Sequence, residues 1–220
     1  IYYKKLLSGN PEDFAVYANS PFDGKNRLIL VAKDVSSRYS RRNRTEFGKV
    51  ADYITELAHS HVGNYMVFFP SYRLMEDVLQ VYEEEFSVDW VRCVCQTPDM
   101  TEQEREGFLE EFQEREGTLV GFCVLGGIFS EGVDLTGESL IGAVIVGTGL
   151  PQIGSQREIL KEYYDKKNHC GFDYAYRYPG MNKVLQAAGR VIRTKEDKGV
   201  ILLLDDRFWD RDYQEIFPRE

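Results

Sequence analysis

The segment YMVFF, Tyr65 to Phe69, is an unbroken run of apolar and aromatic residues without a charge. Such a strand has no face suited to water, so we predict that it lies inside a sheet with both faces covered. Pro70 ends the run, and Ser71 is placed to cap a helix predicted for Tyr72 to Glu84. Further strands are predicted at Arg27 to Lys33, Ser87 to Gln96, Leu119 to Leu125, Leu140 to Val146 and Gly199 to Leu204.

Helical spacing of apolar residues occurs between these runs. It predicts a helix at Thr45 to Ser60, a glutamate-rich helix at Thr101 to Glu116 and a last helix around Met181 to Thr194. Strand after helix after strand predicts an α/β fold with a mainly parallel central sheet flanked on both faces by helices. Residues 1–26 mix aromatics with glycine and proline, which favours an irregular lead-in. We expect one domain over residues 1–220.

The composition narrows the class of protein. The chain has 220 residues, 43% of them hydrophobic, which suits one well-covered core. Its formal charge of -9 does not attract nucleic acid overall, so a polyanion would have to be bound by local patches. There is no apolar run of about twenty residues and no signal-peptide pattern, so we expect a cytoplasmic protein without membrane contact. The chain starts without Met, as a fragment of a longer protein would.

The cysteines and histidines do not form a metal-binding pattern. Four cysteines are scattered, and no second pair completes the pair at Cys93 and Cys95. The three histidines lack ligand spacing with a third partner. We therefore expect structural thiols and no metal site.

The stretch QAAGRVIR, Gln186 to Arg193, has one basic face if it is helical. On a helix, Gln186, Arg190 and Arg193 fall within about 60° of one another, with the apolar residues opposite. No Asp or Glu occurs from Tyr174 to Lys195. An arginine fork matches phosphate oxygens, so an anion is expected opposite this face. The alternative is a solvated amphipathic helix.

Three loops follow predicted strands, where ligands of parallel sheets bind. Ser71 and Tyr72 place a hydroxyl at the N-terminus of a predicted helix, which favours binding of a phosphate group. The loop after Leu125 carries two glycines and then Glu131, Gly132 and Asp134. The loop SSRYSRRNR, residues 36–44, could hold a phosphate backbone or could simply be solvated. Each motif alone is weak evidence.

A nucleotide site is incomplete in this sequence. There is no Walker A loop and no aspartate-glutamate pair at a strand end, so the chain cannot hold and hydrolyse a nucleotide alone in the manner of P-loop enzymes. Phosphate-directed arginines without a P-loop amount to half of a site.

The order of the motifs identifies a resemblance. VFFPSY (Val67 to Tyr72), GGIFSEGVDL (Gly126 to Leu135), QAAGRVIRT (Gln186 to Thr194) and LLLDDRF (Leu202 to Phe208) together resemble the second RecA-like motor domain of superfamily two DNA helicases. The branch is that of the XPD and DinG proteins, and the likeness spans most of the chain. QxxGRxxR with SEGxD is highly specific, whereas FPSY alone is not.

The resemblance implies roles for named residues. Arg193 would be the arginine finger on the γ-phosphate of ATP, with Arg190 beside it and Gln186 ordering that face. Glu131, Gly132 and Asp134 would belong to the motif that senses nucleotide and couples it to DNA. Three further residues would lie along single-stranded DNA, namely Ser71, Tyr72 and Gln96.

The resemblance also implies partners. ATP and Mg²⁺ would be shared with an N-terminal P-loop motor domain of the same protein, which also holds the family's iron-sulfur cysteines. The cysteines here do not match those, so no cluster is expected in this chain. The leading hypothesis is half of an ATP-dependent, five-prime to three-prime DNA helicase of the DNA-repair type. The rivals are a nucleic-acid or protein-binding module without ATPase activity, and an α/β enzyme whose glycine-rich loop binds a small phosphorylated substrate.

Overall fold

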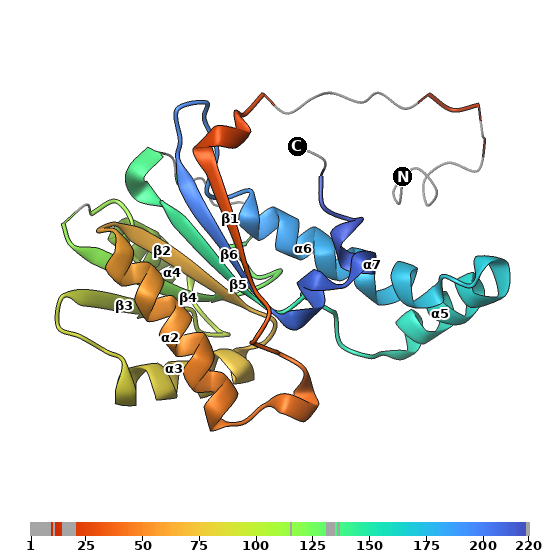
Figure 1. The fold of residues 1–220 in the computed structure, drawn as a ribbon, viewed down its shortest axis with the longest axis horizontal. Helices are drawn as coiled ribbons and strands as arrows, with labels where there is room; N and C mark the ends of the chain where they lie inside the picture. Colours follow the sequence, from red (N-terminus) through yellow and green to blue (C-terminus); the bar gives the residue numbers. More distant parts are fainter. Residues whose placement is uncertain are drawn as a thin grey trace.

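The architecture is a six-stranded sheet in which every neighbouring pair of strands is parallel (Figure 1). The computed structural model describes residues 10, 12–14, 21–114, 116–130, 135 and 137–218. Across the sheet the strands are β1 (Arg27–Ala32), β6 (Gly199–Leu204), β5 (Gly142–Val146), β2 (Asn64–Phe69), β4 (Thr118–Val124) and β3 (Val91–Cys95). We call the end at which the strands begin the amino edge, and the end at which they finish the carboxyl edge.

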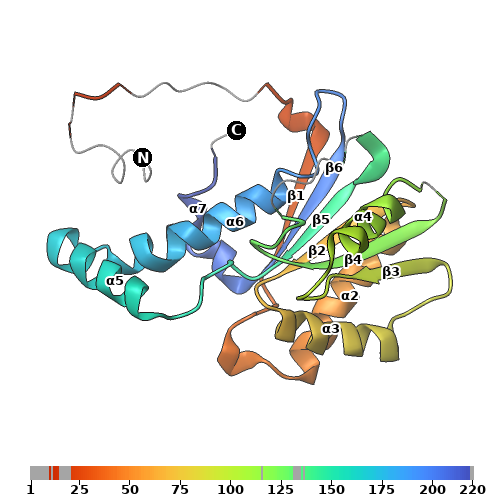
Figure 2. The same ribbon diagram turned by 180° about the vertical axis from the view of Figure 1, so that it is seen from behind.

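Helices cover both faces of the sheet (Figures 1 and 2). On one face lie α2 (Arg44–Ser60) and α3 (Tyr72–Glu85), which pack against alternate residues of the central strands. On the other face lie α4 (Glu102–Glu111), α6 (Tyr178–Ala188) and the short α7 (Arg211–Gln214). All residues of β2, β4 and β5 are buried, as their apolar sequences predict for covered strands. The predicted three-layer α/β fold is confirmed.

The last helix ends earlier than predicted. The prediction extended it to Thr194, but α6 stops at Ala188 and Gly189 caps it. Glycine is a poor helix former, and the N–H groups of Arg193 and Thr194 bond the carboxylate of Asp197 rather than helix carbonyls. The chain turns instead and enters β6. Arg190 and Arg193 therefore lie beyond the helix, and the single helical face drawn through Gln186 was wrong.

Helix α5 (Ser155–Asn168) was not predicted from the sequence, and it extends away from the sheet in Figure 1. It packs on the π-helical segment Asp173–Arg177, where the rings of Tyr164 and Tyr174 stack with centroids 3.9 Å apart. Its apolar residues form too narrow a stripe among charges to give a clear helical signal. No helix within the described residues has the length and apolar character required to cross a membrane.

The edge strand β1 remains partly open. Leu28 is 56% exposed, and Ile29 and Leu30 are also exposed. Leu28 and Leu30 line a groove of about 1280 Å³ between β1 and α2. None of the residues singled out from the sequence lines this groove within the described parts of the chain.

Candidate functional site

The predicted site residues fall at two opposite edges of the sheet. Ser71 and Tyr72 follow β2, and Gln96 follows β3, so these three lie at the carboxyl edge. The turn after α6 lies at the amino edge, where the backbone oxygen of Lys195 accepts a 3.0 Å hydrogen bond from Asn26, just before β1. The structure therefore brings the predicted DNA residues together but separates them from the predicted nucleotide arginines.

At the carboxyl edge, Gln96 orients Tyr72. The Gln96 amide nitrogen donates to the Tyr72 hydroxyl at 2.9 Å, and its amide oxygen accepts from the N–H of Val124 at 3.0 Å. Gln96 is only 3% exposed, whereas Tyr72 is half-buried. Burial raises the pKa of the Tyr72 phenol, which stays protonated at neutral pH. Gln96 is therefore placed to hold the aromatic ring rather than to present its own amide.

Ser71 is the N-cap of α3. Its hydroxyl oxygen accepts a 3.3 Å hydrogen bond from the N–H of Leu74, as the sequence predicted for a cap. The helix N-terminus beside it carries the positive end of the helix dipole. A phosphate group near Ser71 would meet this dipole, and Tyr72 would lie next to it.

At the amino edge, Arg190 connects two loops. Its guanidinium Nε and Nη2 donate to the backbone oxygen of Ser130 at 3.1 and 2.9 Å. Gln186 is exposed on α6, and Arg193 is exposed on the following turn. Val191 and Ile192, between the arginines, are buried in the core. The apolar residues thus anchor the turn while Arg193 faces outward.

Asp197 shapes the turn that carries Arg193. One carboxylate oxygen accepts from the N–H groups of Arg193 and Thr194, both at 2.7 Å, and the other accepts from the Thr194 hydroxyl at 2.7 Å. Burial raises the pKa of Asp197, but these hydrogen bonds outweigh burial and leave the pKa lowered. The backbone at Arg193 is therefore fixed by an ionised carboxylate that sequence reasoning did not identify.

Glu131, Gly132 and Asp134 lie outside the described residues. Their predicted role in sensing nucleotide stays a prediction. The part of their loop that is described, Leu125 to Ser130, starts beside Gln96 at the carboxyl edge and reaches Arg190 at Ser130. The loop thus approaches both predicted sites.

A buried polar cluster at the carboxyl edge was also missed. Asp205 is fully buried and accepts hydrogen bonds from the N–H and hydroxyl of Ser37, at 3.0 and 2.6 Å. Arg207 donates to both Asp205 oxygens, at 2.7 and 2.9 Å. The signal available in the sequence was an Asp directly after the apolar run GVILLL, with a nearby arginine. This cluster fixes the loop after β1.

Similarity to known proteins identifies the family of the chain. The helicase C-terminal domain family matches residues 54–220, which is most of the sequence. The chain belongs to this family. This helicase C-terminal domain is 29% identical over 202 residues to a probable ATP-dependent helicase of Methanocaldococcus jannaschii, covering 87% of the chain and 30% of that protein. It is also 29% identical over 189 residues to the ATP-dependent DNA helicase XPD of Sulfolobus acidocaldarius, covering 81% of the chain and 31% of that protein.

Solved structures agree with the RecA-like fold. An XPD helicase structure superposes with a TM-score of 0.71 at 24% identity, covering 86% of this chain and 33% of that one. The structure of Xpd4 from S. tokodaii superposes with a TM-score of 0.67 at 13% identity, covering 96% of this chain and 40% of that one. The resemblance to the second motor domain of the XPD and DinG branch is confirmed. The chain spans about a third of the length of the two curated relatives named above.

Proposed function

We propose that this helicase C-terminal domain is the second motor domain of an ATP-dependent DNA helicase. It would work with an N-terminal P-loop motor domain, which would bind ATP and Mg²⁺. The chain has no Walker A loop, so its own contribution is to complete the nucleotide site and to bind single-stranded DNA. The observation that carries the proposal is the exposed Arg193, fixed on a turn by Asp197 in a chain of this family.

Arg193 suits the role of an arginine finger. Its backbone is held by Asp197, while its side chain lies at the surface, where a second domain can approach. Bound ATP would supply a γ-phosphate whose transfer to water releases the free energy for movement. A guanidinium there would stabilise the negative charge that develops on the transferred phosphoryl group. Arg190 and Gln186 would support that face, and Glu131, Gly132 and Asp134 would sense the nucleotide.

The carboxyl edge suits single-stranded DNA. Ser71 and the start of α3 offer a helix N-terminus for a phosphate, and Tyr72 offers an aromatic ring on which a base can stack. Gln96 would act by holding Tyr72 in place. Closure of the two motor domains on ATP, and their reopening after hydrolysis, would move the DNA along this edge. We propose five-prime to three-prime movement and a cytoplasmic role in DNA repair.

The test uses the full-length protein with its P-loop domain and measures DNA-stimulated ATPase activity. Arg193→Ala should lower kcat about 1,000-fold or more, because the finger acts on the transition state. The affinity for single-stranded DNA should stay unchanged, since Arg193 lies at the opposite edge from the DNA residues. Lys195→Ala, at an exposed position of the same turn, is the matched control and should keep full turnover.

Turnover within a factor of two of the unaltered protein would exclude the finger assignment. DNA binding without any ATPase activity in the unaltered full-length protein would favour the binding-module alternative instead.

A further inference from the structure

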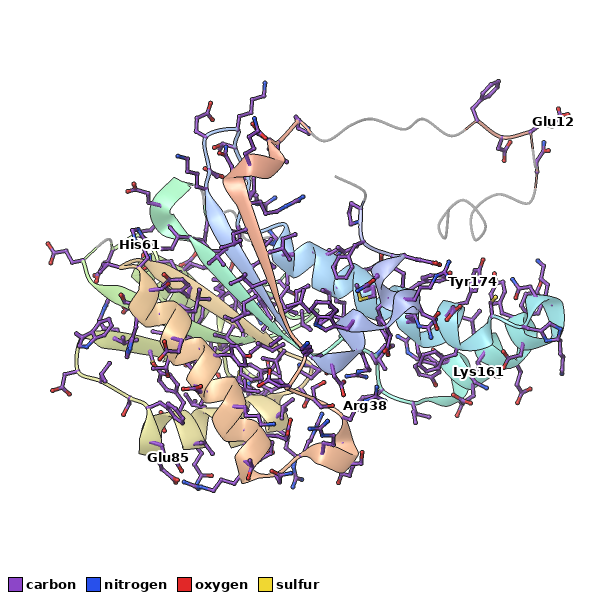
Figure 3. All side chains as sticks on the ribbon, in the orientation of Figure 1. Glu12, Arg38, His61, Glu85, Lys161 and Tyr174 are labelled. Atoms are coloured by element: carbon purple, nitrogen blue, oxygen red, sulfur yellow. The ribbon has the colours of Figure 1, made fainter. Side chains whose placement is uncertain are left out.

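The loop between β1 and α2, residues 33–43, contains all but the last residue of the basic stretch SSRYSRRNR, residues 36–44. Asp205 and Arg207 hold its base through Ser37, and the N–H of Ser36 donates to the buried carboxylate of Glu46 at 3.0 Å. The loop is therefore a fixed part of the carboxyl edge. Figure 3 shows Arg38 at one end of α2 and His61 at the other, which places the loop away from the amino edge.

Most arginines of this segment already have acidic partners. Arg41 pairs with Glu46 at 2.9 Å, and Arg38 lies 3.5 Å from Asp206. Arg44, at the start of α2, pairs with Glu84 at 2.8 Å and also with Glu85. Each of these three guanidinium groups therefore already faces a carboxylate.

Arg42 and Arg73 differ from these three. Within the described residues, neither has a carboxylate at ion-pair distance. Burial is the main cause that lowers the pKa of Arg42, while the charges of Asp77 and Tyr39 oppose the shift and the smaller effects of Arg73 and Arg207 add to it. Arg42 therefore lies among charged groups of both signs, with Arg73 among them. A phosphate group between Arg42 and Arg73 can accept hydrogen bonds from both guanidinium groups.

Tyr39 provides an aromatic surface beside these arginines. Its side chain is 83% exposed, although tyrosine rings are usually partly buried, and the Arg42 guanidinium lies 5.6 Å from the ring centroid. One ring face is thus supported by a cation, and the rest of the ring is open to a planar ligand. Exposed aromatic rings beside cations are typical of sites that bind single-stranded nucleic acid without sequence preference.

The cluster is continuous with the carboxyl-edge residues already described. Gly147, directly after β5, lies close to both Ser37 and Pro70, and Pro70 precedes Ser71. Arg73 directly follows Tyr72 on α3. The loop that carries Tyr39 and Arg42 and the start of α3 that carries Arg73 therefore lie at the same edge of the sheet as Ser71 and Tyr72.

We propose that Tyr39, Arg42 and Arg73 form a further subsite for single-stranded DNA, in which the two arginines hold a phosphate and Tyr39 stacks on the adjoining base. This proposal rests on the proposed DNA-binding function and extends its track to the loop after β1. It requires no sequence preference, because every base offers a flat face to the ring.

The test measures binding of a fluorescein-labelled oligo-dT to the full-length protein by fluorescence anisotropy over a series of salt concentrations. The double variant Arg42→Gln with Arg73→Gln should raise Kd about tenfold, and it should reduce the slope of log Kd against log salt by about 0.7 for each phosphate that the arginines no longer neutralise. Tyr39→Ala should also raise Kd about tenfold, whereas Tyr39→Phe, which keeps the ring, should bind nearly as the unaltered protein does. Arg44→Gln, whose guanidinium already has acidic partners, is the matched control and should change neither quantity.

A second measurement separates stacking from a change in the loop itself. An oligonucleotide with 2-aminopurine should lose fluorescence on binding, and Tyr39→Ala should restore part of it. Unchanged Kd, salt slope and 2-aminopurine signal in the Tyr39, Arg42 and Arg73 variants would overturn the subsite. If Tyr72→Ala still weakened binding in that case, the proposed function would stand. Absence of single-stranded DNA binding in the unaltered protein would instead refute the proposed DNA track as a whole.

Discussion

Asp205 shows how a buried charge can be retained at the end of a strand. Burial raises the pKa of this carboxyl. Arg207 lowers it through hydrogen bonds and its charge, and Ser37 lowers it through further hydrogen bonds. Together these contacts outweigh burial and hold the pKa at about 2. The group is therefore ionised at neutral pH and paired inside the protein. Its role is structural, because it joins the end of β6 to the loop after β1.

Replacement of this carboxylate should be costly. Asp205→Asn leaves Arg207 buried without its ion-pair partner, so we expect a loss of about 3 kcal/mol in the free energy of unfolding. Urea denaturation followed by circular dichroism measures it. The neighbouring Asp206→Asn is the control. The contacts of Asp206 with Arg38 and Arg41 are 3.5 and 3.7 Å long and more exposed, so this substitution should lower the free energy of unfolding by less than about 1 kcal/mol. Equal losses in the two variants would contradict the assignment.

The same residue predicts a dependence of stability on pH. The folded pKa of Asp205, about 2, lies below the value of about 3.9 for an unfolded aspartate. A lowered pKa stabilises the fold above the unfolded value, and this contribution of about 3 kcal/mol is lost progressively as the pH falls from about 5 to 1. Denaturation at a series of pH values should show less loss over this window in Asp205→Asn than in the unaltered chain. An identical loss in both would exclude Asp205 as its source.

At the scale of elements, Gly147 sets the spacing between loops of the carboxyl edge. Its φ is +79°, and a Cβ there would collide with the Ser37 hydroxyl. Gly147→Ala should therefore destabilise the fold by more than about 1 kcal/mol, and it should weaken DNA binding through the displaced β1–α2 loop. Gly154→Ala, at a glycine with extended backbone and open space, should have a small effect on either measurement. Thermal unfolding measures the change in stability, and fluorescence anisotropy measures the change in DNA binding. If Gly147→Ala changed both as little as Gly154→Ala does, the β1–α2 loop would not depend on this contact.

The strands could be predicted from the sequence more reliably than the connections. YMVFF, LVGFCVL and GVILLL have no polar face, so burial on both sides is dictated by the residues themselves. The end of α6 depends on Asp197, which lies nine residues beyond Ala188 and acts through backbone hydrogen bonds that leave no periodic signal. Helix α5 depends on stacking with Tyr174 from a later segment. Local patterns cannot reveal such contacts between distant residues.

The candidate site was predictable in its residue types but not in its arrangement. The motif order singled out Arg193 and Tyr72, yet a linear sequence does not say at which edge of the sheet each loop lies. Gln96 was expected along the DNA, whereas its amide is used inside the protein. The difference arises because a buried amide must satisfy its own hydrogen bonds before it can meet a ligand.

At the scale of the whole molecule, the loop from Leu125 to Ser130 is the described connection between the two predicted sites. Arg190 holds its far end. Arg190→Ala in the full-length protein should reduce the factor by which single-stranded DNA changes the affinity for nucleotide. Because coupling between two binding sites is reciprocal, the factor by which nucleotide changes the affinity for DNA should fall equally. Titrations of a fluorescent ATP analogue with and without DNA measure one factor, and DNA titrations with and without the analogue measure the other. Lys183→Ala, on the preceding turns of α6, is a control with a side chain beside Gly126 but no part in the Ser130 contact. Full coupling in Arg190→Ala would show that the signal passes elsewhere.

The open edge of β1 has a consequence for the chain when it is handled alone. Leu28, Ile29 and Leu30 present apolar side chains along a strand whose outer edge pairs with no other described strand. Such an edge is a template for adding a strand from a second molecule. The net charge of -9 keeps separate molecules apart at low ionic strength, but salt screens that repulsion over about 8 Å at 0.15 M. Colloidal stability of the chain should thus fall as the salt concentration rises. The affinity for DNA should fall over the same range because salt weakens phosphate binding. Light scattering should therefore accompany every salt titration, to separate aggregation from loss of DNA binding.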